Sequence, residues 1–151
     1  MNATRIVAID YGMARIGLAV SDTTKLIATP MATFKVERKS NQTIEKLVAT
    51  LQEHERTYGY SIEMIVVGFP LLMSGKKGLL ADEVSHFVEL LKAAIAVPIV
   101  TWDERLTSVQ ADRSLREGNL SRKKRSQKVD SVAAVIILQN YLDFRRMEKL
   151  D

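Results

Sequence analysis

Three acidic residues of this 151-residue chain stand beside apolar runs, where carboxylates could carry out chemistry. Asp10 ends the apolar run 6–9, so it lies where a buried strand opens into a turn. Glu104 closely follows another apolar run, and Asp130 lies inside the apolar stretch 129–142. Carboxylates gathered at one site repel one another, and their oxygens suit a hard cation. If the three acids converge, they predict a site for Mg²⁺ or Mn²⁺.

Such a site could hydrolyse phosphodiester bonds, since a pair of these ions activates water and stabilises the leaving oxygen. Each acid by itself also has a structural explanation, which the sequence leaves open. Asp10 could cap the turn that follows it, Glu104 could pair with Arg105 or cap a helix, and Asp130 could favour a helix N-terminus. Asp130 is the most informative of the three, because a carboxylate among apolar neighbours is costly unless it is paired or metal-bound.

Two other acids are expected to be structural. Asp22 should end the second strand, which runs antiparallel to the first, and so lie at the opposite edge of the sheet. Asp103 should cap a turn or pair with a nearby arginine. The chain has no cysteine, and His54 and His86 fall in helical patterns without nearby ligands. Zinc and thiolate chemistry are therefore not expected.

Positive charge is concentrated in one segment. Residues 113–128 hold seven basic residues and one acid, Glu117, which gives a local net charge of +6 in a chain whose total is +4. Such a run is often only a solvated surface loop. Its place between Glu104 and Asp130 instead favours an anionic polymer, because lysine and arginine gain affinity by releasing phosphate counterions. The residues expected to contact nucleic acid are Arg15, Lys76, Lys77, Arg122, Lys123, Lys124, Arg125 and Lys128.

Hydrophobic periodicity predicts an α/β chain. The expected strands cover 5–10, 15–21, 26–36, 64–67 and 99–101, and the expected helices cover 40–58, about 80–91, 107–118 and about 126–146. The first two strands should form a hairpin, and Pro30 suits an edge position for the third. Ser40 is expected to be the N-cap of the first helix, and a capping box at Thr107 should open the third.

The order of these elements predicts where the acids meet. Strand-helix-strand units require parallel pairing and right-handed crossovers, so the first, fourth and fifth strands should lie side by side. Their carboxyl ends then share one rim, which is where open α/β sheets bind ligands. Asp10 and Glu104 reach this rim directly. Asp130, expected in the first turn of the last helix, reaches it if that helix packs over the sheet.

Composition predicts one globular domain over residues 1–151. The chain is 46% hydrophobic and 26% charged, which are ordinary values for a soluble protein. No apolar stretch approaches the roughly 20 residues of a membrane helix, and the first residues lead into a strand rather than a secretory signal. We therefore expect no membrane association and a cytoplasmic location. No dimer face is evident, so a monomer or weak homodimer is expected.

Several motifs together resemble the YqgF family, relatives of RuvC-type resolvases in the ribonuclease H-like superfamily. The resemblance spans nearly the whole chain and rests on AIDYG at 8–12, RIGLAVSD at 15–22, VVGFP at 66–70 with Gly75 and Gly78, DERLTS at 103–108 and KVDSVAA at 128–134. It implies a ribonuclease H-like fold, a five-stranded mixed sheet flanked by helices. It also implies a metal-dependent nuclease with Asp10, Glu104 and Asp130 as its acids, which trims the 5′ end of precursor 16S ribosomal RNA.

Other functions remain open at this point. The same family has also been described as a Holliday junction resolvase, which should be a dimer that cuts branched DNA symmetrically. A non-catalytic RNA-binding factor of ribosome assembly is a third possibility, although the presence of all three acids argues against it. An actin-like or sugar-kinase ATPase would need a second domain to close over its nucleotide, and 151 residues leave no room for one.

Overall fold

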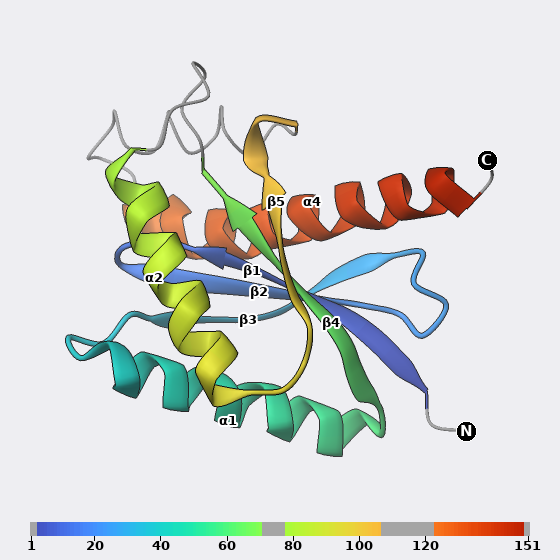
Figure 1. Ribbon diagram of the computed structural model, residues 1–151, viewed down its shortest axis with the longest axis horizontal. Helices are drawn as coiled ribbons and strands as arrows, with labels where there is room; N and C mark the ends of the chain where they lie inside the picture. Colours follow the sequence, from blue (N-terminus) through green and yellow to red (C-terminus); the bar gives the residue numbers. More distant parts are fainter. Residues whose placement is uncertain (1–2, 71–77, 107–122, 150–151) are drawn as a thin grey trace.

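The computed structural model describes residues 3–70, 78–106 and 123–149, and for residues 106, 123–131 and 149 it describes the backbone alone. Figure 1 shows the arrangement of the elements. In chain order they are β1 (Thr4–Tyr11), β2 (Arg15–Ser21), β3 (Ala28–Lys35), α1 (Ser40–Tyr58), β4 (Ser61–Phe69), α2 (Leu79–Ala94), β5 (Ile99–Asp103), the 3-10 helix η1 (Glu104–Leu106) and α4 (Lys123–Lys149).

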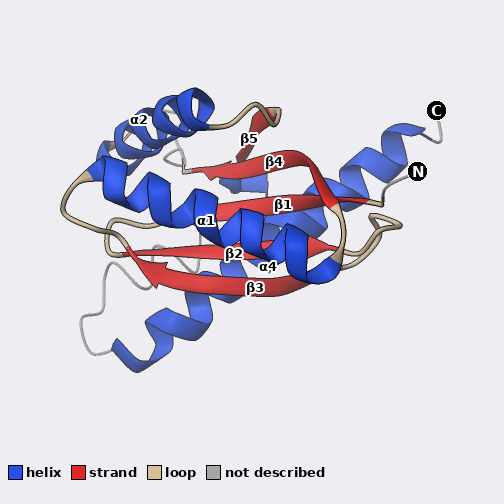
Figure 2. Cartoon of the chain, turned by 90° about the horizontal axis from the view of Figure 1, so that it is seen from below, coloured by secondary structure: helices blue, strands red, loops and turns tan. Residues whose placement is uncertain are grey.

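The strands form one mixed sheet in the order β3-β2-β1-β4-β5 (Figure 2). β1, β2 and β3 pair antiparallel, whereas β1, β4 and β5 pair parallel, as the sequence predicts. β3 is an edge strand and carries Pro30, whose pairing with Ala19 adjoins a shift of register. An edge position tolerates proline because its missing N–H is not needed by a further strand.

Helices cover both faces of the sheet, α1 and α2 on one and α4 on the other (Figures 1 and 2). In β1 the side chains alternate between these two layers. Val7 and Ile9 belong to the core beneath α1 and α2, whereas Ile6 and Ala8 belong to the core beneath α4. Strands buried on both faces read as continuous apolar runs, which is why β1 was recognisable in the sequence. The alternation places Asp10 on the α4 face.

The last helix begins earlier than predicted. α4 starts at Lys123 rather than near residue 126, so its first turns hold basic residues that we expected in a loop. Cations at a helix N-terminus oppose the helix dipole, and a sequence pattern therefore favours a later start. Asp130 consequently lies about two turns into α4 and not in its first turn. The helix predicted over 107–118 lies outside the described residues.

The start of α1 also differs from the prediction. Ser40 is the first helical residue, and the N-cap is Lys39, which has extended backbone angles and no side-chain capping bond. A different hydroxyl organises this end, since the N–H of Glu37 donates to Thr43 Oγ1 over 2.8 Å. The predicted end is confirmed: Gly59 closes the helix with a φ of 67° in the left-handed region, where glycine is favoured.

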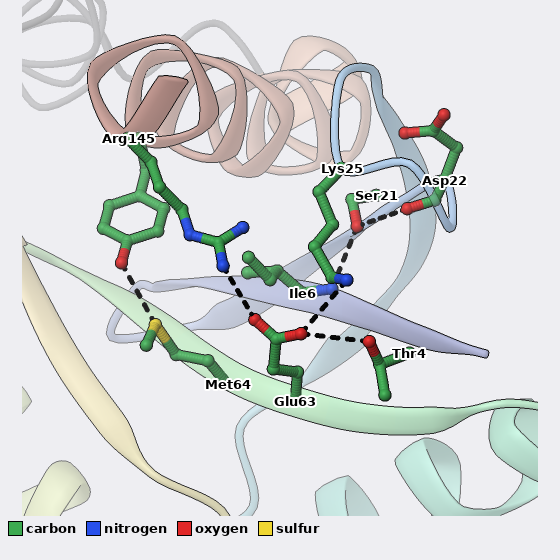
Figure 3. A network of polar contacts seen from close by, with 9 residues as sticks. Thr4, Ile6, Ser21, Asp22, Lys25, Glu63, Met64 and Arg145 are labelled. Atoms are coloured by element: carbon green, nitrogen blue, oxygen red, sulfur yellow. Dashed lines mark hydrogen bonds and ion pairs between the residues drawn. The ribbon is translucent and has the colours of Figure 1, made fainter. Parts of the chain in front are cut away.

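Polar contacts fix the C-terminal half of α4 on the sheet (Figure 3). Glu63 of β4 binds Lys25 Nζ at 3.1 Å and a guanidinium nitrogen of Arg145 at 3.0 Å, and it accepts a hydrogen bond from the Thr4 hydroxyl. Gln139 of α4 adds two hydrogen bonds of 2.9 Å to the backbone of residues 26–28. Half-exposed ion pairs each contribute little, about 1 kcal/mol or less. Their combined effect is geometric. Arg145 joins α4 to Glu63 of β4, which also binds Thr4 of β1, and Gln139 joins α4 to β3 and the loop before it.

None of the helices in the described ranges is long and apolar enough to span a membrane.

Candidate functional site

Asp10 lies at the carboxyl end of β1 and is almost completely buried, with 1% of its surface exposed. It pairs with Gly17 across the β1–β2 ladder. The turn that follows is tight, since the Gly12 N–H donates to the carbonyl of Arg15 over 2.8 Å. A Cβ at position 12 would stand 2.8 Å from the same oxygen, so the turn requires glycine. The hairpin thereby holds Asp10 at the rim on the α4 face.

Glu104 is the second buried acid, with 0% of its surface exposed. Its two sequence neighbours pair with each other at the surface. The Arg105 guanidinium binds the Asp103 carboxylate at 2.7 Å, and the Arg105 backbone N–H donates to the same carboxylate over 2.9 Å. The hydrogen bond from the Arg105 side chain holds the pKa of Asp103 below its usual value. The expected pairing of Asp103 with an arginine is thus confirmed. These contacts hold the start of η1 at the surface, whereas the Glu104 side chain between the two residues is buried.

Gly68 of β4 makes room for the Glu104 side chain. A Cβ at this position would lie 3.3 Å from both Cγ and Cδ of Glu104 and 2.5 Å from Cδ1 of Ile137 on α4. The carboxyl group therefore rests directly over the bare backbone of β4, beside α4. The sequence pattern by itself predicts only that a strand ends at Gly68. A glycine inside an apolar strand is a recognised signal of a close approach, which could have revealed it.

The strand register brings the two acids together. Ile9 pairs with Val67, so continuing the parallel ladder by one residue places Asp10 beside Gly68. Glu104 lies over Gly68, and adjacent strands are about 5 Å apart. Both carboxylates therefore occupy the α4 face of neighbouring strands at one rim, as the topology predicts. One shared site accounts for the positions of both acids, whereas a turn cap for Asp10 and an ion pair or helix cap for Glu104 would be two unrelated explanations.

Asp130 is placed through its backbone in α4. It precedes Ala133, Ala134 and Ile137 by three, four and seven residues, the spacing of one helix stripe. Those three residues are buried in the core between α4 and the sheet. Its place two turns into α4 weakens the helix-terminus explanation, because the dipole effect falls off within the first turn. Its side chain lies outside the description, and the described side chains alone contain no cluster of three potential metal ligands.

Two basic residues flank the acids on the α4 face. Arg15 of β2 pairs with Lys35 of β3, and alternation along β2 puts both on the same face as Gly17 and Asp10. Arg15 is half-buried and Lys35 is exposed, so both positive charges are accessible to an anionic ligand at this rim. Lys35 was missed in the sequence, because only the β2–β3 register brings it beside Arg15.

The other basic residues are placed only partly. Figure 1 shows the first turns of α4, with Lys123, Lys124, Arg125 and Lys128, at the same end of the molecule as the β1–β2 turn. Their backbone is helical, which corrects the expectation of a loop. Lys76, Lys77 and Arg122 lie outside the described residues. The part of this set that the structure places thus gathers near the end that carries Arg15.

Asp22 is structural, as predicted. It follows β2 at the opposite rim, where its Oδ1 accepts the N–H groups of Leu26 at 2.8 Å and Ile27 at 3.0 Å, and Oδ2 accepts the Thr24 hydroxyl. Slight burial raises the pKa of Asp22, but these hydrogen bonds outweigh it and lower the pKa to about 2. They hold the loop in which Lys25 has a φ of 61°.

Comparisons with known proteins agree with this architecture. The solved structure of T. thermophilus RuvC in complex with a Holliday junction substrate aligns with a TM-score of 0.54 at 18% identity, covering 95% of this chain and 96% of that one. This likeness shows the fold alone, and it confirms the ribonuclease H-like architecture.

Sequence relatives are much closer. One from Protochlamydia amoebophila is 57% identical over 142 residues, covering 94% of this chain and 95% of the relative. One from Thermoanaerobacter pseudethanolicus is 43% identical over 144 residues, covering 94% and 98%. Both carry the name "Putative pre-16S rRNA nuclease". The family model RuvX, described as Holliday junction resolvase, matches residues 4–144. The chain therefore belongs to the RuvX family, which confirms the resemblance drawn from its motifs.

Proposed function

We propose that this chain is a metal-dependent nuclease that hydrolyses phosphodiester bonds with Asp10, Glu104 and Asp130 as its metal ligands. The observation that carries the proposal is the convergence of two buried carboxylates over adjacent strands at one rim. Position 130 lies on the stripe of α4 that faces the sheet, one turn before Ala133 and Ala134. Membership of a family of nucleases supports the same reaction class.

The residues present fit a hard divalent cation. All three proposed ligands are carboxylates, and neither histidine nor cysteine takes part, which matches the oxygen preference of Mg²⁺ and Mn²⁺. Burying two carboxylates side by side is costly unless positive charge neutralises them. When bound there, such ions would supply an activated water and stabilise the leaving oxygen. We propose Mg²⁺ or Mn²⁺ on this ground.

The chain itself would position the substrate. Arg15 and Lys35, paired across β2 and β3 on the same face, would bind phosphates on one side of the carboxylates. The basic first turns of α4 would extend this contact along the nucleic acid. Gly68 and Ile137 are buried between α4 and the sheet, and the absence of a side chain at Gly68 leaves the room that Glu104 occupies.

The substrate we propose is the precursor of 16S ribosomal RNA, trimmed at its 5′ end, either free or in a ribosomal particle. The names of the relatives, 57% and 43% identical to this chain, support this choice. Action on this RNA would place the protein in the cytoplasm. We propose a monomer or weak homodimer as the active form.

A second candidate is resolution of Holliday junctions. The description of the RuvX model and the shared fold with RuvC favour it. A resolvase must cut two strands symmetrically, so it would require a stable dimer with two sites. A non-catalytic RNA-binding role in ribosome assembly is the third alternative, and the convergence of buried acids argues against it.

The Asp10→Asn variant tests the nuclease proposal. It removes the charge of one ligand with little change of volume, so we expect cleavage to be lost while nucleic-acid binding persists. The Asp22→Asn variant is the matched control, because Asp22 lies at the opposite rim. Both variants should be compared at equal folding with Mg²⁺ and with Mn²⁺. Cleavage by Asp10→Asn at the wild-type rate would refute the shared site.

The substrate is tested in cells. Depletion of the protein followed by mapping of ribosomal RNA ends should reveal precursor 16S RNA with an extended 5′ end. Normal ends together with persistent recombination junctions would favour the resolvase. Rescue of the RNA ends by the Asp10→Asn variant would favour the non-catalytic role.

A further inference from the structure

An aromatic cluster lies on the β5 side of the carboxylate site, away from Arg15 and Lys35, and Trp102 is the member next to Gly68. Trp102 of β5 packs against the core beneath α4, and it pairs with Gly68 in the β4–β5 ladder, two residues before Glu104 begins η1. The ring of Phe144 on α4 lies against it, with centroids 5.3 Å apart and planes inclined by 58°. Tyr141 meets the same indole edge to face at 5.6 Å.

Phe144 is exposed although it packs on this cluster. Its exposed fraction is 47%, whereas Trp102 is half-buried. The third ring, that of Tyr141, has a partner in the protein, because its hydroxyl donates to Met64 Sδ over 3.1 Å. An exposed phenylalanine on a rigid aromatic base loses little conformational freedom when another ring stacks on it. Trp102 and Phe144 together are therefore suited to contact with another aromatic ring.

The indole contributes no polar recognition within the described structure. Its Nε1 is buried and has no hydrogen-bond partner among the described residues. Buried tryptophan N–H groups usually find a partner. Among the described residues, the contacts that hold this indole are those with the rings of Tyr141 and Phe144. A ligand at this surface would consequently be held by ring contact, with little preference among flat aromatic groups.

We propose that Trp102 and Phe144 form a stacking platform for an unpaired nucleobase next to the bond that is cut. This inference rests on the proposed nuclease function. Trp102 pairs with Gly68 across the β4–β5 ladder, and Glu104 lies over Gly68, so Trp102 lies within reach of a nucleotide that adjoins the Glu104 carboxylate. Aromatic side chains bind single-stranded nucleic acids by stacking, whereas bases inside a duplex are already stacked on one another.

The platform gives the site a direction. Arg15 and Lys35 contact phosphates on the β2–β3 side, which suits a paired or a single-stranded backbone alike. Phe144 and Trp102 at the β5 side accept only a base that is free of its partner. The site would therefore prefer a bond that adjoins an unpaired nucleotide, over a bond within a continuous duplex.

The experiment uses the full-length protein with a chelator, so that binding is measured without cleavage. A short single-stranded RNA and the same sequence in a duplex are titrated separately. Trp102 is the only tryptophan of the chain, so its fluorescence reports contact directly. Anisotropy of a labelled RNA supplies the affinity independently.

We expect single-stranded RNA to quench Trp102 and the duplex to leave its fluorescence unchanged. Phe144→Ala should lower the affinity for single-stranded RNA about tenfold, and Phe144→Tyr should leave that affinity unchanged. Tyr58→Ala is the matched control, because Tyr58 is also an exposed aromatic, stacked on His54 in the other helical layer.

An unchanged single-strand affinity in Phe144→Ala would overturn the proposal, as would an equal loss for the duplex. If Phe144→Ala changes self-association in sedimentation while its RNA affinity stays intact, this face binds a second copy of the chain. That result would also overturn the proposal. The nuclease proposal fails separately, through equal cleavage by wild type and Asp10→Asn. The binding assay contains no divalent metal and does not depend on that result.

Discussion

Replacement of Gly68 by alanine probes the packing that brings β4, α4 and Glu104 together. The added Cβ would lie 2.5 Å from Cδ1 of Ile137, whereas carbon atoms normally approach to about 3.5–4.0 Å. Ile137 is completely buried, so its side chain cannot turn into solvent to relieve the contact. Overpacking of this kind costs about 1–3 kcal/mol. We expect Gly68→Ala to lower the free energy of unfolding by about 2 kcal/mol.

A double-mutant cycle isolates the contact. Ile137→Val deletes the Cδ1 atom that the new Cβ would strike, and alone it should cost about 0.5–1.5 kcal/mol. Urea denaturation of the wild type, both single variants and the double variant gives the coupling. We expect the double variant to be more stable than the sum of the single effects by about 1–2 kcal/mol.

Cleavage activity separates packing from chemistry in the same four proteins. The new Cβ would still lie 3.3 Å from Cγ and Cδ of Glu104 in the double variant. Stability should therefore recover while cleavage stays impaired. Additive effects on stability, within about 0.5 kcal/mol, would mean that Ile137 does not lie over Gly68. Full recovery of cleavage would mean that the place of Glu104 does not matter.

Two other perturbations act at opposite ends of the sheet. Neutralising Lys123, Lys124 and Arg125 to glutamine should weaken nucleic-acid binding and reduce its salt slope by about two, measured against the control Lys92→Gln on α2; an unchanged slope would contradict a phosphate contact. Asp22→Asn should lower stability near neutral pH, because the folded state depresses the pKa of Asp22 to about 2. Its difference from wild type in urea denaturation should disappear as the pH falls through that value, and a constant difference down to pH 2 would contradict the pKa.

The parts of the fold that the sequence predicted share one physical origin. Strands covered on both faces must be apolar throughout, so β1 and β4 stood out as runs, and a carboxylate at the end of such a run was conspicuous. The rules of parallel connection then placed Asp10 and Glu104 on one rim without any knowledge of distances. The antiparallel direction of β2 in the hairpin likewise predicts Asp22 at the opposite rim.

The parts that the sequence missed depend on contacts between distant segments. The start of α4 at Lys123 contradicts the local preference against cations at a helix N-terminus, which placed that start later. The contact of Gly68 with Ile137 joins a strand to a helix far along the chain. Lys35 became visible only through its register with Arg15. In each case neighbours in space, which no local pattern records, decided the outcome.

The affinity for Mn²⁺ is the most direct test of the proposed site. Calorimetric titration of the wild type, Asp10→Asn, Asp130→Asn and the opposite-rim control Asp22→Asn would measure it for each protein. We expect Asp10→Asn and Asp130→Asn to lose about tenfold or more in affinity, at least the effect of losing an outer-sphere partner of a metal. Asp22→Asn should bind as the wild type does. Binding of Mn²⁺ by Asp130→Asn with wild-type affinity would remove α4 from the site and contradict the account.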